Sequence, residues 1–330
     1  MKILFRVDGG KEIGYGHFVR SFAVAQELQK RGHDVYWASS QLEKELAEIL
    51  WRTGIGVISI RGDIGGVQDR KDLLSIVNCY NNPDWVFLDG YSFAEEYLIP
   101  LYVSRSLVAT MDDMGRLKSY FAHLVVHTNS ATSLRGQENT HFLYGPSFVP
   151  LRSEFLGVPN LIHRSLHRHP RIARNLLLYM GSRDSEYTIR RIRDVLMPFG
   201  VKLNIREVSS FGDTQPWKLM TWADMAMSFG GSSVWELAYM GVPTIGVSRG
   251  EQEDVLLQNT SVRGITLNYG RADAIRSDLG YTIASLLLDK HHRKRMSDRG
   301  KRLIDGLGAK RIALAMEGYQ KWLSTGQQSK

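Results

Sequence analysis

A histidine follows two closely spaced glycines near the start of the chain. The segment Ile13-Gly14-Tyr15-Gly16-His17 comes after an apolar, strand-like run, and apolar residues at helical spacing follow it. Glycines let the backbone approach a ligand closely, and a helix N-terminus attracts anions and disfavours the imidazolium. We therefore take Gly14, Tyr15 and Gly16 as candidate diphosphate contacts and His17 as a candidate catalytic base. The simpler interpretation, that His17 caps the helix or fills a polar gap, stays open.

This loop does not match the fingerprint of dinucleotide-binding proteins. That pattern needs a third glycine three residues after Gly16, where this chain has Val19. The loop therefore predicts a site for an anion and gives no support for NAD.

A second glycine-bearing turn lies in the later half of the chain. Gly230, Gly231, Ser232 and Ser233 separate a strand-like run from a helix-like one, and Glu236 follows one helical turn after Ser232. Free N–H groups and two hydroxyls suit a diphosphate, and Glu236 could accept hydrogen bonds from a ribose. A plain helix start with an exposed Glu is the alternative, but it gives no reason for the paired glycines.

Further polar residues are weaker candidates. Asp89 and Tyr91 end a strand-like run at the edge where α/β sheets bind ligands, so we expect sugar contacts there. The pair Asp112-Asp113 suits a divalent cation, the sugar or a strand-end cap. His163, His167 and His169 have metal-like spacing but lie in a basic stretch without nearby Cys or carboxylates, so we expect no metal. We expect Cys79 to be a buried, inert thiol.

Strand-like and helix-like runs alternate along both halves of the chain, which favours parallel sheets covered on both faces. The expected strands include Ile3–Val7, Trp85–Leu88, Leu107–Thr110, Leu176–Met180 and Val201–Ile205. The rhythm stops in a stretch rich in Pro, His and Arg and then restarts. We expect a domain over 1–150, a linker over 151–170 and a second domain over 171–330. The helical segment 309–323 is a candidate to pack back on the first domain. This organisation predicts an α/β protein of two Rossmann-like, doubly wound domains with a cleft between them.

Bulk properties exclude several classes of protein. The chain has 330 residues, 43% of them hydrophobic, and a formal net charge of +8. No run is long and apolar enough to span a membrane, and the N-terminus lacks the features of a signal peptide. A single cysteine fits a reducing compartment, so we expect a cytoplasmic protein. The basic residues are spread along the chain and form no nucleic-acid-binding motif; we expect no nucleic-acid partner, and the sequence does not indicate an oligomeric state.

Several segments together resemble a known family. The opening, Phe5-Arg6-Val7-Asp8 with Gly14-Tyr15-Gly16-His17 and Arg20-Ser21, resembles the UDP-sugar hydrolases of pseudaminic acid biosynthesis. Four further segments agree in order and spacing: Leu88-Asp89-Gly90-Tyr91, Met111-Asp112-Asp113, Gly145-Pro146-Ser147-Phe148, and Gly230-Gly231-Ser232-Ser233 with Glu236. That family shares a glycosyltransferase-B-type (GT-B) fold with spore-coat polysaccharide proteins.

The resemblance implies a nucleotide-sugar hydrolase. UDP would leave from a UDP-aminosugar, His17 would activate the attacking water, and Asp8, Arg20 and Gln252 join the sugar-binding candidates. No cofactor or metal is implied. The chain departs from the family at Arg183, in a turn that usually reads Gly-Gly-Ser-Asp, and at Glu251, where an Asn usually precedes the Gln.

Two alternatives remain beside hydrolysis. A GT-B glycosyltransferase would use the same donor site, with His17 deprotonating an acceptor hydroxyl in place of water. A non-catalytic subunit would bind the nucleotide sugar without turnover. Sequence does not separate them, because function resides in the site and not in the fold.

Overall fold

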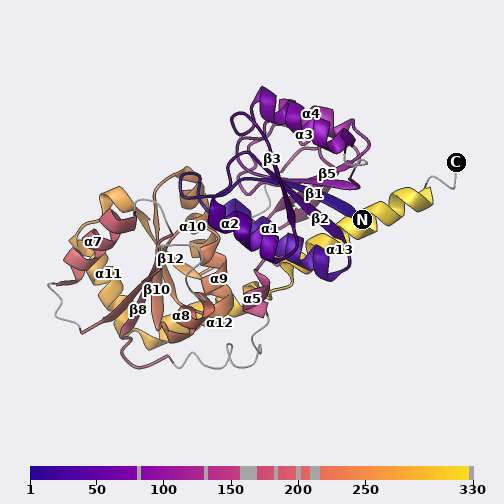
Figure 1. Ribbon diagram of the computed structural model, residues 1–330. Helices are drawn as coiled ribbons and strands as arrows, with labels where there is room; N and C mark the ends of the chain where they lie inside the picture. Colours follow the sequence, from indigo (N-terminus) through magenta and orange to yellow (C-terminus); the bar gives the residue numbers. More distant parts are fainter. Residues whose placement is uncertain are drawn as a thin grey trace. The chain divides into compact units, whose positions relative to one another are not determined.

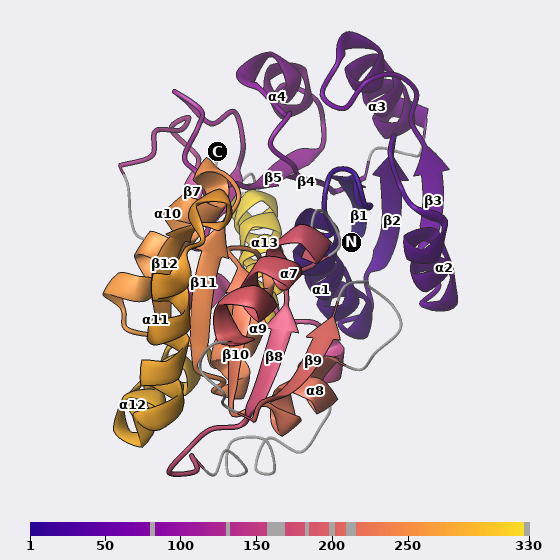
Figure 2. The same cartoon turned by 90° about the vertical axis from the view of Figure 1, so that its left-hand side faces the viewer.

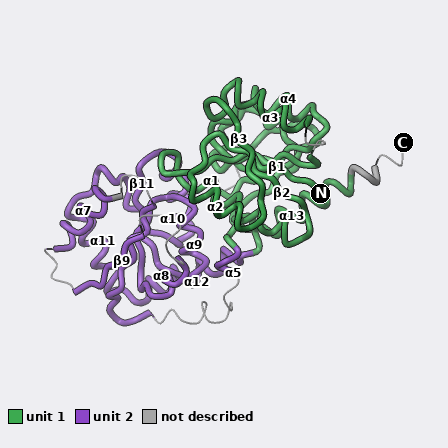
Figure 3. Tube along the Cα trace, in the orientation of Figure 1, with its two compact units in different colours: residues 1–152, 307–330 green, residues 153–306 purple. Residues whose placement is uncertain are grey.

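The computed structural model describes residues 1–79, 83–129, 133–156, 169–181, 185–197, 202–208 and 216–326 (Figure 1). The chain forms two compact units, residues 1–152 with 307–330, and residues 153–306 (Figure 3). Each unit has its own parallel sheet with helices on both faces, so the expected α/β class is confirmed. The expected cleft between the domains stays a prediction.

The first unit contains a seven-stranded sheet in the order β3-β2-β1-β4-β5-β6-β7, with every neighbouring pair parallel. The register pairs Val7 with Asp89 and Asp89 with Met111, so the carboxyl ends of β1, β4 and β5 lie side by side. The strands are β1 (Lys2–Val7), β2 (Asp34–Ser39), β3 (Gly56–Ser59), β4 (Trp85–Asp89), β5 (Leu107–Met111), β6 (Leu124–His127) and β7 (His141–Tyr144).

The side chains of these strands alternate between the two faces of the sheet, and helices pack on both faces. On one face, Leu73 and Tyr97 pack with Leu4 and Leu88 in a buried cluster. On the other, Phe18 lies against Trp37 with 5.2 Å between ring centroids. The helices of this unit are α1 (Gly16–Lys30), α2 (Lys44–Arg52), α3 (Val67–Cys79), α4 (Glu95–Tyr102), the short 3₁₀ helix η1 (Pro146–Phe148) and α13 (Gly308–Gly326).

The C-terminal helix α13 groups with the first unit. Its Glu317 accepts hydrogen bonds from Arg31 at 2.8 and 2.7 Å and pairs with His33 at 2.8 Å. The first unit thus takes in residues 307–330, whereas the expectation from sequence extended the second domain to 330. Most of the expected linker, residues 157–168, lies outside the described part of the chain.

The second unit contains a five-stranded parallel sheet in the order β12-β11-β10-β8-β9 (Figure 2). Its strands are β8 (Asn175–Tyr179), β9 (Asn204–Val208), β10 (Met225–Phe229), β11 (Thr244–Ser248) and β12 (Thr266–Arg271). Its helices are α5 (Ser153–Leu156), α7 (Ser185–Leu196), α8 (Pro216–Trp222), α9 (Ser233–Met240), α10 (Glu251–Val262), η3 (Ala272–Ala274), α11 (Ser277–Leu288) and α12 (Lys290–Leu303).

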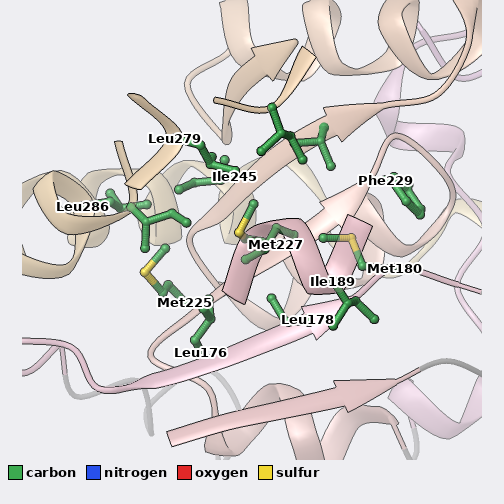
Figure 4. Close-up of a cluster of buried hydrophobic side chains, with 14 of the residues drawn as sticks. Leu176, Leu178, Met180, Ile189, Met225, Met227, Phe229, Ile245, Leu279 and Leu286 are labelled. Atoms are coloured by element: carbon green, nitrogen blue, oxygen red, sulfur yellow. The ribbon is translucent and has the colours of Figure 1, made fainter. Parts of the chain in front are cut away.

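One face of this sheet carries a core of aliphatic and methionine side chains (Figure 4). Met225 and Met227 of β10 pack there with Ile189 of α7 and Leu279 of α11. The unbranched methionines fill the irregular space between two helices and the strands. This core holds β10 in place, and with it the Gly-Gly-Ser-Ser turn at the end of that strand.

Two local expectations were wrong. Cys79 is exposed and not buried, because Leu73 and Val77 define the buried face of α3 and a residue two positions after Val77 points away from it. The strand expected near residues 201–205 begins later, at Asn204. Within the described ranges, no helix is long and apolar enough to cross a membrane.

The contacts of Glu317 with Arg31 and His33 predict that α13 becomes less stable in acid. Hydrogen bonds from Arg31 lower the pKa of Glu317 from 4.5 to about 2, burial opposes this, and His33 adds to the lowering. A carboxylate with a lowered pKa stabilises the fold above its unfolded value and loses that effect as pH falls towards the folded one. Glu317→Gln should therefore lower the hydrogen-exchange protection of α13 about fivefold at pH 7. This change corresponds to about 1 kcal/mol in the free energy of local opening, a size typical of a partly exposed ion pair.

The wild-type protein should lose the same protection between pH 4.5 and 2, and the Gln variant should not. Glu48→Gln removes an exposed carboxylate paired with Arg52 and serves as the control. Equal α13 protection in wild type and Glu317→Gln would show that the pair does not hold this helix.

Candidate functional site

His17 lies in the first turn of α1 and is paired with a buried carboxylate. Its Nδ1 lies 2.8 Å from Oδ1 of Asp89, the last residue of β4. The α1 N-cap residue is Tyr15, and no side chain caps the helix there. The simpler interpretation of His17 as a helix cap is therefore not what the geometry shows. Parallel pairing of β1 with β4 brings the two residues together, since α1 begins just after β1.

Asp89 binds three side chains of α1. Its Oδ2 accepts hydrogen bonds from Arg20 Nε at 2.7 Å and Ser21 Oγ at 2.8 Å, and its Oδ1 accepts one from Arg20 Nη2 at 2.5 Å. Burial raises the pKa of Asp89, but Arg20 first and His17 second outweigh it and lower the value to about 2. The carboxylate therefore stays ionised near neutral pH.

The contacts decide which nitrogen of His17 carries the proton. Arg20 Nη2, a donor only, lies 3.2 Å from His17 Nδ1, while the ionised Asp89 lies nearer, at 2.8 Å. A carboxylate facing a lone pair at that distance would be repulsive, so Nδ1 carries the hydrogen and donates it to Asp89. The lone pair is then on Nε2, for which no partner occurs among the described residues. Nε2 is thus available as a base.

Tyr91 covers one side of the imidazole. The two rings meet edge to face with 4.4 Å between centroids, and the Arg116 guanidinium lies 4.8 Å from the Tyr91 ring centre. Burial raises the pKa of Tyr91 to about 12, Arg20 opposes this, and Asp113 and Asp89 add to the rise. The phenol stays protonated, so Tyr91 can donate a hydrogen bond to a ligand but cannot serve as a base near pH 7.

The glycine loop before α1 closes on itself. Gly10 and Gly14 exchange two backbone hydrogen bonds, at 3.2 and 2.7 Å, and Gly14 has a positive φ of 91° with no heavy atom within 4 Å of its Cβ position. The Tyr15 hydroxyl donates to Glu43 at 2.7 Å, which ties the loop to the start of α2. Gly14 and Gly16 thus lie beside His17 with open space at Gly14, and Tyr15 has a structural contact.

Asp8 belongs to a different, buried network. Its Oδ1 accepts from Ser39 Oγ at 2.7 Å and from the amides of Ser40 and Gln41 at 2.8 and 2.9 Å, and its Oδ2 accepts from Arg6 at 2.6 Å. These bonds use most of its lone pairs and order the loop after β2. Sequence reasoning placed Asp8 against the sugar. The geometry shows a structural role for Asp8, and the sugar contact stays a prediction.

The partner of Asp8 was missed from the sequence. The Arg6 guanidinium has no exposed surface and also binds Asp69 at 2.9 and 2.6 Å, while Tyr97 donates to Asp69 at 2.6 Å. An arginine in the middle of the apolar run Ile3–Val7 was the available signal, since a buried charge requires a partner.

In the second unit, the Gly-Gly-Ser-Ser turn joins β10 to α9. A Cβ on Gly230 would lie 2.5 Å from the backbone oxygen of Glu253, so the start of α10 packs directly on this turn. A Cβ on Gly231 would meet nothing within 4 Å. Ser228 and Ser233 share a hydrogen bond at 2.8 Å. The amides of Ser232 and Ser233 lie at the start of α9, where backbone N–H groups have no partner within the helix.

Glu236 and Gln252 flank this turn from two helices. Glu236 is 3% exposed and lies 3.4 Å from the Tyr179 hydroxyl at the end of β8, so it is not the exposed Glu of a plain helix start. Gln252 is exposed in the first turn of α10. Arg249, just before α10, stacks on the Phe229 ring at 4.2 Å. Arg183 lies outside the described residues.

The remaining metal candidates do not form a site in the described ranges, where no group of three His, Cys, Asp or Glu could hold an ion. Asp112 accepts from the amides of Met114, Gly115 and Arg116, which is a strand-end cap. Burial, with Lys301 and Arg293, lowers the pKa of His169 to about 4. His163 and His167 lie outside the described residues.

Two known proteins are similar to this chain in sequence. No model of a known protein family matches the chain. The spore coat polysaccharide biosynthesis protein SpsG of Bacillus subtilis is 21% identical over 339 residues, covering 94% of this chain and 96% of that protein. An uncharacterized protein of Methanocaldococcus jannaschii is 24% identical over 215 residues, 63% of this chain. The match spans 42% of the archaeal protein, so it extends over less than half of that relative.

Solved structures of glycosyltransferases superpose over nearly the whole chain. Acinetobacter baumannii MurG has a TM-score of 0.70 at 13% identity, covering 96% of this chain and 99% of its own. The calicheamicin glycosyltransferase has a TM-score of 0.67 at 14% identity, covering 98% of both chains. The glycosyltransferase VinC, solved with dTDP, has a TM-score of 0.63 at 12% identity, covering 97% and 100%. The chain therefore has the GT-B fold with two Rossmann-like domains.

The two glycines of the β10–α9 turn should respond differently to alanine. Gly230→Ala forces its Cβ against the Glu253 backbone, which cannot yield as a flexible side chain would. Urea unfolding should show a loss of about 1–3 kcal/mol, typical of overpacking. Gly231→Ala, the matched control, should stay within about 0.5 kcal/mol of wild type. Equal stability of the two variants would contradict this packing.

Proposed function

We propose that this protein transfers a sugar from a nucleoside-diphosphate sugar to an acceptor hydroxyl, with His17 as the base. The observation that carries the proposal is the His17–Asp89 pair, which leaves Nε2 without a described partner at the carboxyl edge of a parallel sheet. This is the edge at which open α/β sheets bind ligands. The glycosyltransferases that share the fold favour transfer as the reaction class.

The reaction follows from the charges at this edge. His17 Nε2 takes the proton of the acceptor hydroxyl as its oxygen bonds to the anomeric carbon. The bond from that carbon to the diphosphate breaks, and the nucleoside diphosphate leaves with the electron pair. Asp89, already ionised, stabilises the imidazolium that forms. General-base assistance of this kind contributes on the order of 10²–10⁴-fold. Tyr91 is a proposed sugar contact on this unit.

The second unit supplies the proposed nucleotide site. A phosphate oxygen fits the open space at Gly231, where it would meet the amides at the start of α9 and the dipole of that helix. Glu236 lies one turn further along α9 and is the proposed ribose contact, and Gln252 is a proposed contact to the sugar. We propose UDP as the nucleotide, on the resemblance of the Gly230–Glu236 segment.

Water is the second candidate acceptor. The opening segment from Phe5 to Ser21 resembles UDP-sugar hydrolases, and a hydrolase would need the same base and the same leaving group. The two reactions differ only in what His17 deprotonates. One assay therefore separates them from each other and from a subunit that binds without turnover.

His17→Gln should abolish turnover while leaving the nucleotide bound. Purified protein would be incubated with a panel of UDP- and dTDP-sugars, with and without mixed sugar and polyol acceptors, and nucleoside diphosphate release measured. Wild type should release the nucleotide only with an acceptor, and His17→Gln should be slower by on the order of 10²–10⁴-fold. Release without an acceptor, still lost in His17→Gln, would identify a hydrolase. Equal rates in wild type and variant would refute His17 as the base.

Gly231→Ala should separate binding from folding. A methyl group there occupies the space proposed for a phosphate oxygen, so UDP affinity measured by calorimetry should fall about tenfold or more, as expected when a group that needs close backbone approach is blocked. Gly318→Ala alters an open glycine of α13, in the first unit, and should leave UDP affinity unchanged. Unchanged affinity in Gly231→Ala would place the diphosphate elsewhere.

A further inference from the structure

Asp113 is connected to the proposed base through Arg20. Asp113 binds Arg20, and Arg20 binds Asp89, the carboxylate that pairs with His17. Asp113 follows β5, the strand beside β4, and so comes to the same sheet edge as Asp89. Its Oδ2 binds Arg20 Nη1 in a short contact. Its Oδ1 accepts from the Thr128 amide at 3.0 Å and the Thr128 hydroxyl at 2.6 Å. Asp113 is thus anchored on one side by the end of β6 and holds Arg20 with the other.

Arg20 is held between two carboxylates as a planar fork. Its Nε and Nη2 face Asp89, and its Nη1 faces Asp113. The side chain is 11% exposed, and its two anionic partners raise the pKa of Arg20 against the effect of burial. A guanidinium is rigid and planar, so fixing the Nη1 end fixes the direction of the other two nitrogens.

The orientation of Arg20 matters because it can compete for the histidine. Arg20 Nη2 already lies 3.2 Å from His17 Nδ1, the atom that donates to Asp89. If the guanidinium turned towards His17, it would offer a hydrogen to Nδ1 and favour the tautomer protonated on Nε2. That tautomer has no lone pair on Nε2 and cannot act as the base. Among the described residues, Tyr91 and, behind it, Arg116 also lie beside the imidazole.

We propose that Asp113 is a positioning residue that, by restraining Arg20, keeps His17 in the tautomer with its lone pair on Nε2. Asp113 does this without touching His17. It turns the Arg20 fork towards Asp89, so that Asp89 remains the acceptor for His17 Nδ1–H. The tautomer can be measured without any substrate, whereas the kinetic consequence rests on the proposed function.

The test is the tautomer of His17 in Asp113→Asn. Protein labelled with ¹⁵N-histidine would be studied by long-range ¹H–¹⁵N NMR at a pH where the ring is neutral, with the His17 signals assigned from His17→Gln. Wild type should show mainly the Nδ1–H form. In Asp113→Asn the ratio of the Nε2–H to the Nδ1–H form should rise about fivefold, as expected for a weakened charged hydrogen bond. Asp72→Asn, which removes a carboxylate bound to the exposed Arg61, is the matched control and should show no change.

A second variant covers the case in which Asp113→Asn does not fold. Thr128→Val keeps the side-chain shape and removes one of the two hydrogen bonds that Thr128 donates to Asp113, so it should move the ratio in the same direction by about twofold. An unchanged ratio in folded protein, judged by its amide spectrum, would overturn the proposal. With an active donor in hand, kcat of Asp113→Asn should fall in proportion to the fraction of His17 that the NMR spectra show in the Nδ1–H form, at unchanged donor KM. Absence of turnover would count against the proposed function and leave the NMR result standing.

Discussion

The buried carboxylate of Asp89 is the group on which the proposed site depends. It lies at the end of a central strand with no exposed side-chain surface, and it accepts hydrogen bonds from α1 at three positions, His17, Arg20 and Ser21. A buried carboxylate without such partners would be strongly destabilised. Because these partners surround it, the Asp89 carboxylate remains charged and fixes the first turns of α1. It also determines which ring nitrogen of His17 carries the free lone pair.

The edge around this carboxylate is built from aligned strand ends. Asp8, Asp89 and the pair Asp112-Asp113 lie at the carboxyl ends of three neighbouring parallel strands, and each carboxylate has a different task. Asp8 orders the loop after β2 with Arg6, Asp112 caps the loop after β5, and Asp113 binds Arg20. Loops fixed in this way need little reorganisation when charge develops during a reaction, which is the property that electrostatic catalysis requires.

The sequence was sufficient to predict the α/β fold and the place of both glycine turns. Periodicity located most strands within a residue or two, because buried parallel strands are short, nearly continuous apolar runs. The burial of Cys79 was predicted wrongly because its position on the helix depends on where α3 begins. The largely polar first turn of α3 does not mark that start in the sequence. The start of β9 was misplaced for a similar reason, since its exposed side chains carry little pattern.

The roles of the polar residues were harder to predict than their location. Arg20, Asp89 and Asp8 were expected to contact a sugar, but their hydrogen bonds are largely satisfied within the first unit. The sequence shows that an aspartate ends a strand; it does not show which arginine reaches it across tens of residues. The place of Glu236 and Gly231 beside a helix N-terminus follows from local spacing alone, and their ligand contacts stay predictions.

The most direct test of the central claim is the turnover of Asp89→Asn. An asparagine of the same shape can donate to His17 Nδ1 and so leaves the proton on Nε2, where it prevents base catalysis. We predict that kcat falls by on the order of 10³-fold or more, as for other histidine bases whose carboxylate partner is changed to an amide. UDP affinity should stay unchanged, because the proposed nucleotide site lies on the second unit. Folded Asp89→Asn protein with near wild-type turnover would contradict the account.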